Sequence, residues 1–193
     1  MTTNGSPVDA ALDDAIVLAT WLRDLERTDG TVGRIATHLT DVLRTGGRVL
    51  TCGNGGSLCD AMHFAEEMSG RFRGDRPALA VQAMADPTHL TCVANDYGFE
   101  RVFSRGVEAW GRKGDALVVF STSGKSPNLI FAVEAARARG LSVVGLLGRD
   151  GGALKSACDH VIIVPGTTSD RIQEVHIKVV HLLIELIEKK LFG

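Results

Sequence analysis

The sequence predicts a three-layer α/β domain, doubly wound around a five-stranded parallel sheet. Short apolar runs that do not alternate with polar residues are separated by segments with helical periodicity, and buried parallel strands have this pattern. Two loops rich in Gly and Ser each follow such a run and precede a helical segment. Doubly wound sheets bind ligands at the carboxyl ends of their strands, so the same two loops mark the expected functional site.

The expected elements follow from these patterns in order. Two amphipathic helices come first, at 8–27 and 31–45, and Gly30 separates them. The five strands are expected at 48–52, 79–83, 116–120, 142–147 and 160–164. The remaining helices are expected at 57–69, 88–94, 98–110, 126–139, 151–157 and 169–191. We divide the chain into an N-terminal helical segment, 1–46, that packs on the core and on neighbouring subunits, and a main domain, 47–193.

The last expected helix is apolar on nearly every face between Ile172 and Ile187. A helix on the outside of a single domain needs only one apolar stripe. We therefore expect a second side of this helix to be covered at a subunit interface, since most soluble assemblies are symmetric homo-oligomers. The alternative is that the N-terminal helical pair of the same chain buries it.

Composition and charge exclude several classes of protein. The chain has 193 residues, of which 45% are hydrophobic, enough for one sizeable core. Its net charge of −2 disfavours a nucleic-acid partner. No apolar run is long enough to cross a membrane and no basic, then apolar leader begins the chain, so we expect a cytoplasmic protein without a membrane partner. Structural disulfides are not expected, because no CxxC spacing occurs among Cys52, Cys59, Cys92 and Cys158.

The first Gly-rich loop, CGNGGS at 52–57, lies between an expected strand and an expected helix. Its glycines remove side chains where backbone N–H groups emerge at a helix start, and both the amides and the helix dipole favour negative charge there. The helix then carries His63 and Glu67, four residues apart and so on one face. This block indicates a sugar-phosphate or nucleotide site beside an acid–base or metal pair, although a His–Glu pair at this spacing is also an ordinary surface pair.

The second loop is STSGKSPN at 121–128. Its four hydroxyl groups and its glycine, at a strand–helix junction, can provide several hydrogen bonds to one phosphate. Helix capping alone explains Ser126, followed by Pro127 in the first turn, but not the run from Ser121 to Ser123. The loop lacks the GxxxxGK[ST] spacing of a nucleotide P-loop, which argues against ATP hydrolysis.

Together these blocks resemble the SIS (sugar isomerase) domain family and, within it, the phosphoheptose isomerases. The resemblance covers residues 47–191 and rests on the blocks CGNGGSLCDAMHFAEEMSGRFRGDRP, CVANDYGFERVFSR, STSGKSPN, GRDGG and DRIQEVHIKVVH. It implies a five-stranded parallel sheet, a homotetramer and the conversion of sedoheptulose 7-phosphate to D-glycero-D-manno-heptose 7-phosphate. That reaction is an aldose–ketose isomerisation and the first step of heptose precursor synthesis.

The resemblance also implies roles for individual residues. The phosphate would be held by Ser121, Thr122, Ser123 and Ser126. The sugar would be held by Asn54, Gly55, Gly56, Glu67, Asn95, Asp96 and Gln173. The acid–base residues would be Glu67 and His181. One zinc ion (Zn2+) per subunit would be bound by His63, Glu67, Gln173 and His181.

The residue types suit this chemistry. Aldose–ketose isomerisation moves a proton between C1 and C2 through an enediol, which requires a base, an acid and stabilisation of an oxyanion. Glu67 can act as the base, and His181 can exchange protons near neutral pH. Gln173 lies eight residues before His181, a little over two helical turns, so both lean to a similar side of the last helix. The nitrogen and oxygen ligands are consistent with zinc.

Three other functions are compatible with parts of this pattern. A non-catalytic SIS protein that binds a replication-initiator partner would lack the acid–base glutamate and histidine that this chain has. An isomerase of another sugar phosphate, such as a hexose phosphate, would use the same loops. A Rossmann-type dinucleotide enzyme is disfavoured, because GNGGS lacks the third glycine of GxGxxG. Arg71 and Asp170 border the expected site and His176 lies near Gln173, but none of the three receives a role.

Overall fold

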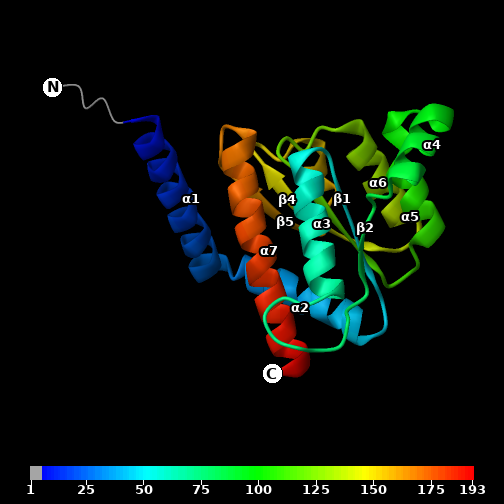
Figure 1. Cartoon of the computed structure of the whole chain (residues 1–193), viewed down its shortest axis with the longest axis horizontal. Helices are drawn as coiled ribbons and strands as arrows, with labels where there is room; N and C mark the ends of the chain where they lie inside the picture. The colour runs from blue at the N-terminus through cyan, green and yellow to red at the C-terminus, as the bar shows by residue number, and fades with distance from the viewer. Residues whose placement is uncertain (1–5) are drawn as a thin grey trace.

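The computed structural model describes residues 6–193. Five parallel strands form one sheet in the order β2-β1-β3-β4-β5 (Figure 1). The strands are β1 (Val49–Gly53), β2 (Val81–Ala83), β3 (Ala116–Ser121), β4 (Ser142–Gly148) and β5 (His160–Val164). The predicted α/β fold class and the five-stranded parallel sheet are confirmed.

Seven α-helices and two short 3-10 helices are found in the described part of the chain. The α-helices are α1 (Pro7–Asp29), α2 (Thr31–Arg44), α3 (Gly56–Ser69), α4 (Pro87–Tyr97), α5 (Ser104–Trp110), α6 (Pro127–Ala138) and α7 (Ser169–Phe192). The 3-10 helices are η1 (Phe99–Arg101) and η2 (Gly152–Ser156).

Two predicted helices differ from the structure. The single helix expected at 98–110 is wrong, since η1 and α5 are separate elements. Val102 and Phe103, which lie between them, are only 0% and 2% exposed, so the chain turns there to bury both side chains. The helix expected at 151–157 is the 3-10 helix η2. Gly151 and Gly152 have φ of 77° and 51°, outside the right-handed helical region, so neither residue can form part of an α-helix.

The sheet has a separate apolar core on each face. Because side chains alternate along a strand, Val118 and Phe120 of β3 join the core under α1, α2, α3 and α7. Leu117 and Val119 of the same strand join the core under α4, α5 and α6. These helical layers on both faces make the three-layer arrangement that the continuous apolar strands predict.

The strand order places the two predicted loops next to each other. The chain crosses from β1 to β2 on one side of the sheet and returns to β3 on the other, so β1 and β3 are neighbours. Gly53, at the end of β1, is paired with Phe120 near the end of β3. This is the point at which the strand order reverses, where open α/β sheets bind ligands.

Helix α7 is largely covered within its own chain. It packs against α2, α3 and α1. Its buried residues are Ile172, Val175, His176, Val179, Val180, Leu183, Ile184 and Ile187. Part of the apolar surface that predicted a subunit interface is therefore explained by the alternative, burial by the N-terminal helices.

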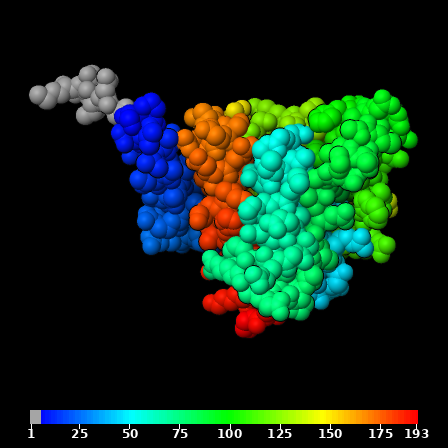
Figure 2. All heavy atoms as spheres, viewed as in Figure 1, coloured from blue at the N-terminus to red at the C-terminus, as the bar shows by residue number. Residues whose placement is uncertain are grey.

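Four of the exposed large apolar residues lie together on α1. Figure 2 shows α1 as a rod at the edge of the molecule, beside α7. Val8, Leu12, Ile16 and Val17 are between 58% and 65% exposed. The inner side of α1 contributes Leu18 to the core.

His176 is a buried histidine that ties α7 to the sheet. Its side chain is fully buried, and Nε2 donates a hydrogen bond to the Leu147 carbonyl of β4 over 3.1 Å. Because Nε2 carries the proton, Nδ1 is an acceptor, and it lies buried with no partner among the described residues. Burial lowers the pKa of His176 to about 4, and its hydrogen bond to Leu147 offsets this only in part.

We expect His176 to make folding stability depend on pH. Between pH 6.5, the ordinary pKa, and about pH 4, the folded value, the unfolded chain binds more protons at His176 than the folded chain does. The stability that the neutral His176 contributes to the folded state is therefore lost as the pH falls through that window. A His176→Gln variant keeps an amide donor for Leu147 but cannot titrate. Between pH 7 and 4.5 the wild type should lose about 2 kcal/mol more of its free energy of unfolding than the variant, measured by urea denaturation.

The comparison with the variant is needed because Asp60 changes the stability of the protein with pH in the opposite direction to His176. Burial raises the pKa of Asp60 to about 6, which favours the folded state as the pH falls. Asp60 is present in both proteins, so its effect cancels in the difference. Equal pH dependence of wild type and His176→Gln would contradict the account.

Candidate active site

The turn after β1 lets α7 approach the start of α3 closely. A Cβ atom at Gly56 would lie 2.7 Å from both amide atoms of the Gln173 side chain. The Gln173 amide also donates to the Ser57 hydroxyl over 3.4 Å. Gly55, the residue before the first turn, makes no side-chain cap; the Ser57 and Leu58 amides instead donate to the Asn54 and Gly55 carbonyls over 3.0 and 2.9 Å. Glycine at position 56 is therefore required for the contact between the two helices.

A pair of asparagines joins the two predicted loops. Asn54, after β1, and Asn128, in the first turn of α6, exchange two side-chain hydrogen bonds of 2.9 and 2.8 Å. Asn128 is 2% exposed. A reciprocal amide pair this well buried holds the two loops in one arrangement.

The serine loop keeps several hydroxyl protons available. The Ser121 hydroxyl accepts from the Gly124 amide over 2.9 Å, and the Ser123 hydroxyl accepts from the Lys125 amide over 3.3 Å. Each hydroxyl that accepts still has its own proton to donate. The loop is also tied to α7, because the Thr122 and Ser169 hydroxyl oxygens are 3.1 Å apart.

Ser126 occupies the cap position of α6, as predicted, but its hydroxyl makes no capping hydrogen bond. The Ser126 hydroxyl therefore faces the loop with its proton free to donate, at the N-terminal end of the α6 dipole, while the Leu129 and Ile130 amides donate to the Ser126 carbonyl. Such a helix start, with the positive end of its dipole, favours an anion.

His63, Glu67 and His181 meet where α3 crosses α7. The His63 Nε2 atom is 3.2 Å from Glu67 Oε1 and 3.3 Å from the Nε2 atom of His181. Glu67 Oε2 is 3.9 Å from His181 Nε2, and it is buried without a hydrogen-bond partner among the described residues. The Glu67 side chain is 17% exposed, while the two imidazoles are 39% and 36% exposed.

This cluster fits a metal ion. One ligand atom from each of the three residues lies within 4.8 Å of the others. Two nitrogen ligands of a tetrahedral zinc ion, each about 2.0–2.1 Å from the metal, are about 3.3 Å apart, which matches the two Nε2 atoms. A cation would also satisfy the buried Glu67 oxygen. The His/Glu/His set is thus a possible metal site, open to solvent on the imidazole side.

Gln173 does not join this cluster. Its amide lies on Gly56 and Ser57, two turns before His63 on α3. The rise of about 1.5 Å per residue separates the backbones of Gln173 and His181 by about 12 Å along α7. The resemblance named Gln173 as a ligand, but its side chain would have to turn toward His181 to become one.

Asn95 and Asp96 are the other predicted site residues that stand apart. They lie on α4, are exposed, and hydrogen-bond to each other over 2.7 Å. Asp96 also accepts from the Cys92 thiol. Among residues 6–193, no hydrogen bond or ion pair links either side chain to the two loops or the His/Glu/His cluster. In Figure 1, α4 lies on the opposite side of α3 from α7.

Sequence reasoning missed Asp60. It precedes His63 by three residues and Glu67 by seven, so the three side chains share one face of α3. Its Oδ2 atom is buried with no partner in the described chain, and burial raises the pKa of Asp60 to about 6 although His63 lowers it. The i, i+3, i+7 spacing was the signal available in the sequence.

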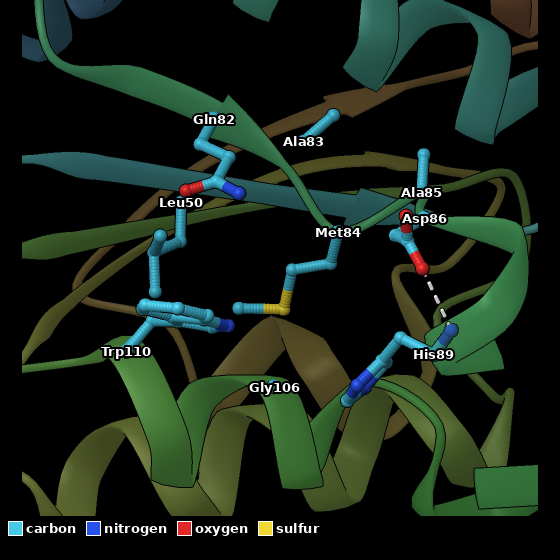
Figure 3. Close-up of a pocket in the computed structure, with 9 residues that line it drawn as sticks. All are labelled: Leu50, Gln82, Ala83, Met84, Ala85, Asp86, His89, Gly106 and Trp110. Atoms are coloured by element: carbon cyan, nitrogen blue, oxygen red, sulfur yellow. Dashed lines mark hydrogen bonds between the residues drawn. The ribbon is translucent and has the colours of Figure 1, made fainter. Parts of the chain in front are cut away.

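A separate cavity lies beside the edge strand β2, with a volume of 270 Å³ (Figure 3). It contains none of the predicted site residues. Leu50, Met84 and Trp110 provide most of its apolar wall. Asp86 accepts from the His89 amide at the start of α4 over 2.7 Å, and His89 Nε2 donates to the Val102 carbonyl over 3.0 Å. Both of its titratable residues already have structural partners.

Comparison with known proteins gives the family. The chain matches the SIS domain family over residues 16–148. It is 57% identical over 159 residues to a phosphoheptose isomerase of Fusobacterium nucleatum, covering 82% of each chain. It resembles the solved phosphoheptose isomerase of Neisseria gonorrhoeae with a TM-score of 0.88 and 39% identity, covering 94% of this chain and 97% of that one. The Francisella tularensis structure has the same TM-score at 33% identity, covering 94% of this chain and 96% of that one. The chain therefore belongs to the SIS domain family and, within it, to the phosphoheptose isomerases.

Proposed function

We propose that the protein converts sedoheptulose 7-phosphate to D-glycero-D-manno-heptose 7-phosphate, the first step of heptose precursor synthesis. Relatives named for phosphoheptose isomerisation, 53–57% identical over most of the chain, support this reaction. The observation that carries it is the meeting of His63, Glu67 and His181 beside the two anion-favouring loops. Together they provide a phosphate anchor and groups that can move a proton.

The phosphate of the substrate would bind in the serine loop. Ser123 and Ser126 have hydroxyl protons to donate, and the start of α6 adds the positive end of its helix dipole. Ser121 and Thr122 complete the set that the family resemblance implies. The anchored phosphate would direct the other end of the sugar toward α3 and α7.

Proton transfer would be carried out by Glu67 and His181. Glu67 Oε2 is the oxygen without a partner, whereas Oε1 is engaged by His63, so Oε2 is the atom that would take the proton from C1 and return it at C2. His181 would move the second proton between the oxygens on C1 and C2, which balances the reaction. The enediol is then formed and consumed without any net change in protons.

The sugar would be bound by residues of the first Gly-rich loop, α3, α7 and α4. Asn54, Gly55 and Gly56 would bind it from the first loop, together with Glu67 and Gln173. Asn95 and Asp96 would bind it from α4, where both side chains are exposed.

We also propose that the metal is zinc, one ion per subunit, held by His63, Glu67 and His181 with Gln173 as the fourth ligand. When bound, zinc would polarise the oxygens of the sugar as a Lewis acid. The nitrogen and oxygen donor set supports this choice. Gln173 would have to leave its contact with Ser57, and Glu67 would have to bind through one oxygen to stay a base.

The assembly and location of the protein are further proposals. The exposed apolar residues Val8, Leu12, Ile16 and Val17 support a homotetramer in which the N-terminal segment 1–46 packs on neighbouring subunits. None of the helices between residues 6 and 193 combines the length and apolar character that a membrane span requires. The cytoplasmic location stays a prediction.

We expect the wild type to isomerise sedoheptulose 7-phosphate and the variants Glu67→Gln and His181→Gln to be almost inactive. Each positioned acid or base contributes about 10²–10⁴ in rate. Formation of the aldose would be followed directly, with circular dichroism to verify folding. Turnover near the wild-type rate in either variant would remove that residue from the mechanism. Absence of aldose with the folded wild type would overturn the proposed reaction.

We expect Ser123→Ala and Ser126→Ala each to raise the KM for sedoheptulose 7-phosphate about 10- to 100-fold, because each removes a hydrogen bond to a charged group worth about 1.5–3 kcal/mol. Thr37→Ala, which removes an exposed hydroxyl of α2, serves as the control. Steady-state kinetics with and without the phosphate group on the sugar measures the effect. If unphosphorylated sedoheptulose reacted equally well, the phosphate site would be misplaced.

We expect one zinc ion per chain in protein purified without chelator, and loss of that zinc in His63→Ala. Elemental analysis after dialysis measures the content. His160→Ala, which alters a histidine at the start of β5, is the control and should keep its zinc. Unchanged zinc in His63→Ala, or no zinc after loading the wild type, would refute the metal site and leave a metal-free mechanism.

A further inference from the structure

The segment 70–77, which follows α3, lies against one face of α7. Phe72 stacks on the His181 ring, with centroids 5.9 Å apart. Arg73 forms an ion pair with Glu185 over 3.1 Å, and Arg76 forms one with Glu188 over 2.8 Å. Positions 181, 185 and 188 are spaced by four and three residues, so they share a face of the helix. Figure 1 shows the segment curving across the C-terminal half of α7.

Arg76 is the buried member of this segment. Its side chain is 5% exposed. One terminal nitrogen donates to the Glu67 carbonyl over 2.6 Å, and the other donates to the carbonyls of Met68 and Gly70 over 2.8 and 3.1 Å. Nε donates to the Glu188 carboxylate over 2.8 Å. The guanidinium thus joins the last turn of α3 to α7.

The chemistry of arginine explains this arrangement. The last carbonyls of a helix have no partner within the helix, and the negative end of the helix dipole attracts a cation. Arginine has five N–H donors in a rigid plane, so one side chain can serve several carbonyls and a carboxylate together. Lysine, with one ammonium group, cannot reach the same set. The 18% exposed Glu188 balances the buried charge.

We propose that Arg76 is a positioning residue of the active site, which fixes the backbone of Glu67 on α3 relative to His181 on α7 through its hydrogen bonds to the Glu67 carbonyl and to Glu188. The proposal rests on the proposed isomerase function. Arg76 touches neither substrate nor metal. Its effect is to hold the Glu67 carboxylate and the His181 imidazole, 3.9 Å apart, in the arrangement in which both can reach one substrate.

The chain offers a matched control for this proposal. Arg73 and Glu185 lie on the same segment and the same face of α7, but their side chains are 67% and 51% exposed. An exposed ion pair of this kind contributes little to stability. Arg73→Ala therefore removes an arginine and an ion pair to α7 without removing the link to the Glu67 carbonyl.

The test compares Arg76→Lys, Glu188→Gln and Arg73→Ala with the wild type, in full-length protein that circular dichroism shows to be fully folded at the assay temperature. Arg76→Lys keeps the charge but loses the planar set of donors, and it should lower kcat about 10- to 100-fold with KM within about twofold, since a small misplacement of reacting groups can cost about 10²-fold. Glu188→Gln keeps an acceptor for the Nε atom of Arg76, so it should lower kcat less than Arg76→Lys does. Arg73→Ala should change neither kcat nor KM by more than about twofold.

A crystal structure of Arg76→Lys provides a readout that does not depend on activity. The separation between Glu67 Oε2 and His181 Nε2 should be larger than in a crystal structure of the wild type determined in the same way. An inactive wild type would refute the proposed function, while the crystal structure would still decide the positioning role. An unchanged separation, an unchanged kcat in Arg76→Lys, or an equal loss in Arg73→Ala would overturn the proposal.

Discussion

The contact between α3 and α7 is the interaction on which the rest of the structure depends. These helices are more than a hundred residues apart in sequence, yet α7 lies close enough for Gln173 to rest on the backbone of Gly56. The buried side of α7 brings it there, because most of its apolar residues face the core formed with α1, α2 and α3. His63 and Glu67 come from one helix and His181 from the other, so the His/Glu/His cluster exists only where the helices dock.

The sheet supplies the second constraint. Placing β1 beside β3 brings the glycine loop and the serine loop together, and the Asn54–Asn128 amide pair fixes one against the other. The starts of α3 and α6 then present the positive ends of their dipoles to the same region, so an anion is favoured there before any charged side chain is considered. In the proposed mechanism, phosphate would bind at the strand ends and proton transfer would take place where the two helices cross.

Much of this arrangement can be predicted from sequence, because local patterns determine it. Continuous apolar runs predict the five buried strands, and the blocks around His63 and His181 predict the two helices whose side chains meet in the His/Glu/His cluster. Tertiary effects explain the failures. The break between η1 and α5 buries Val102 and Phe103, which no local periodicity reveals. Arg76 lies in the run RFRGDRP, whose charges resemble a solvated loop, and only the fold shows that its guanidinium is buried against the end of α3.

In the proposed mechanism, one substrate spans the serine loop and the crossing of α3 and α7. The most direct test is a crystal structure of the Glu67→Gln variant with sedoheptulose 7-phosphate bound. We predict that the phosphate lies on the Ser123 and Ser126 hydroxyls at the start of α6, with C1 and C2 of the sugar between residue 67 and His181. A phosphate bound elsewhere, such as in the cavity beside β2, or a sugar remote from His181, would contradict the account.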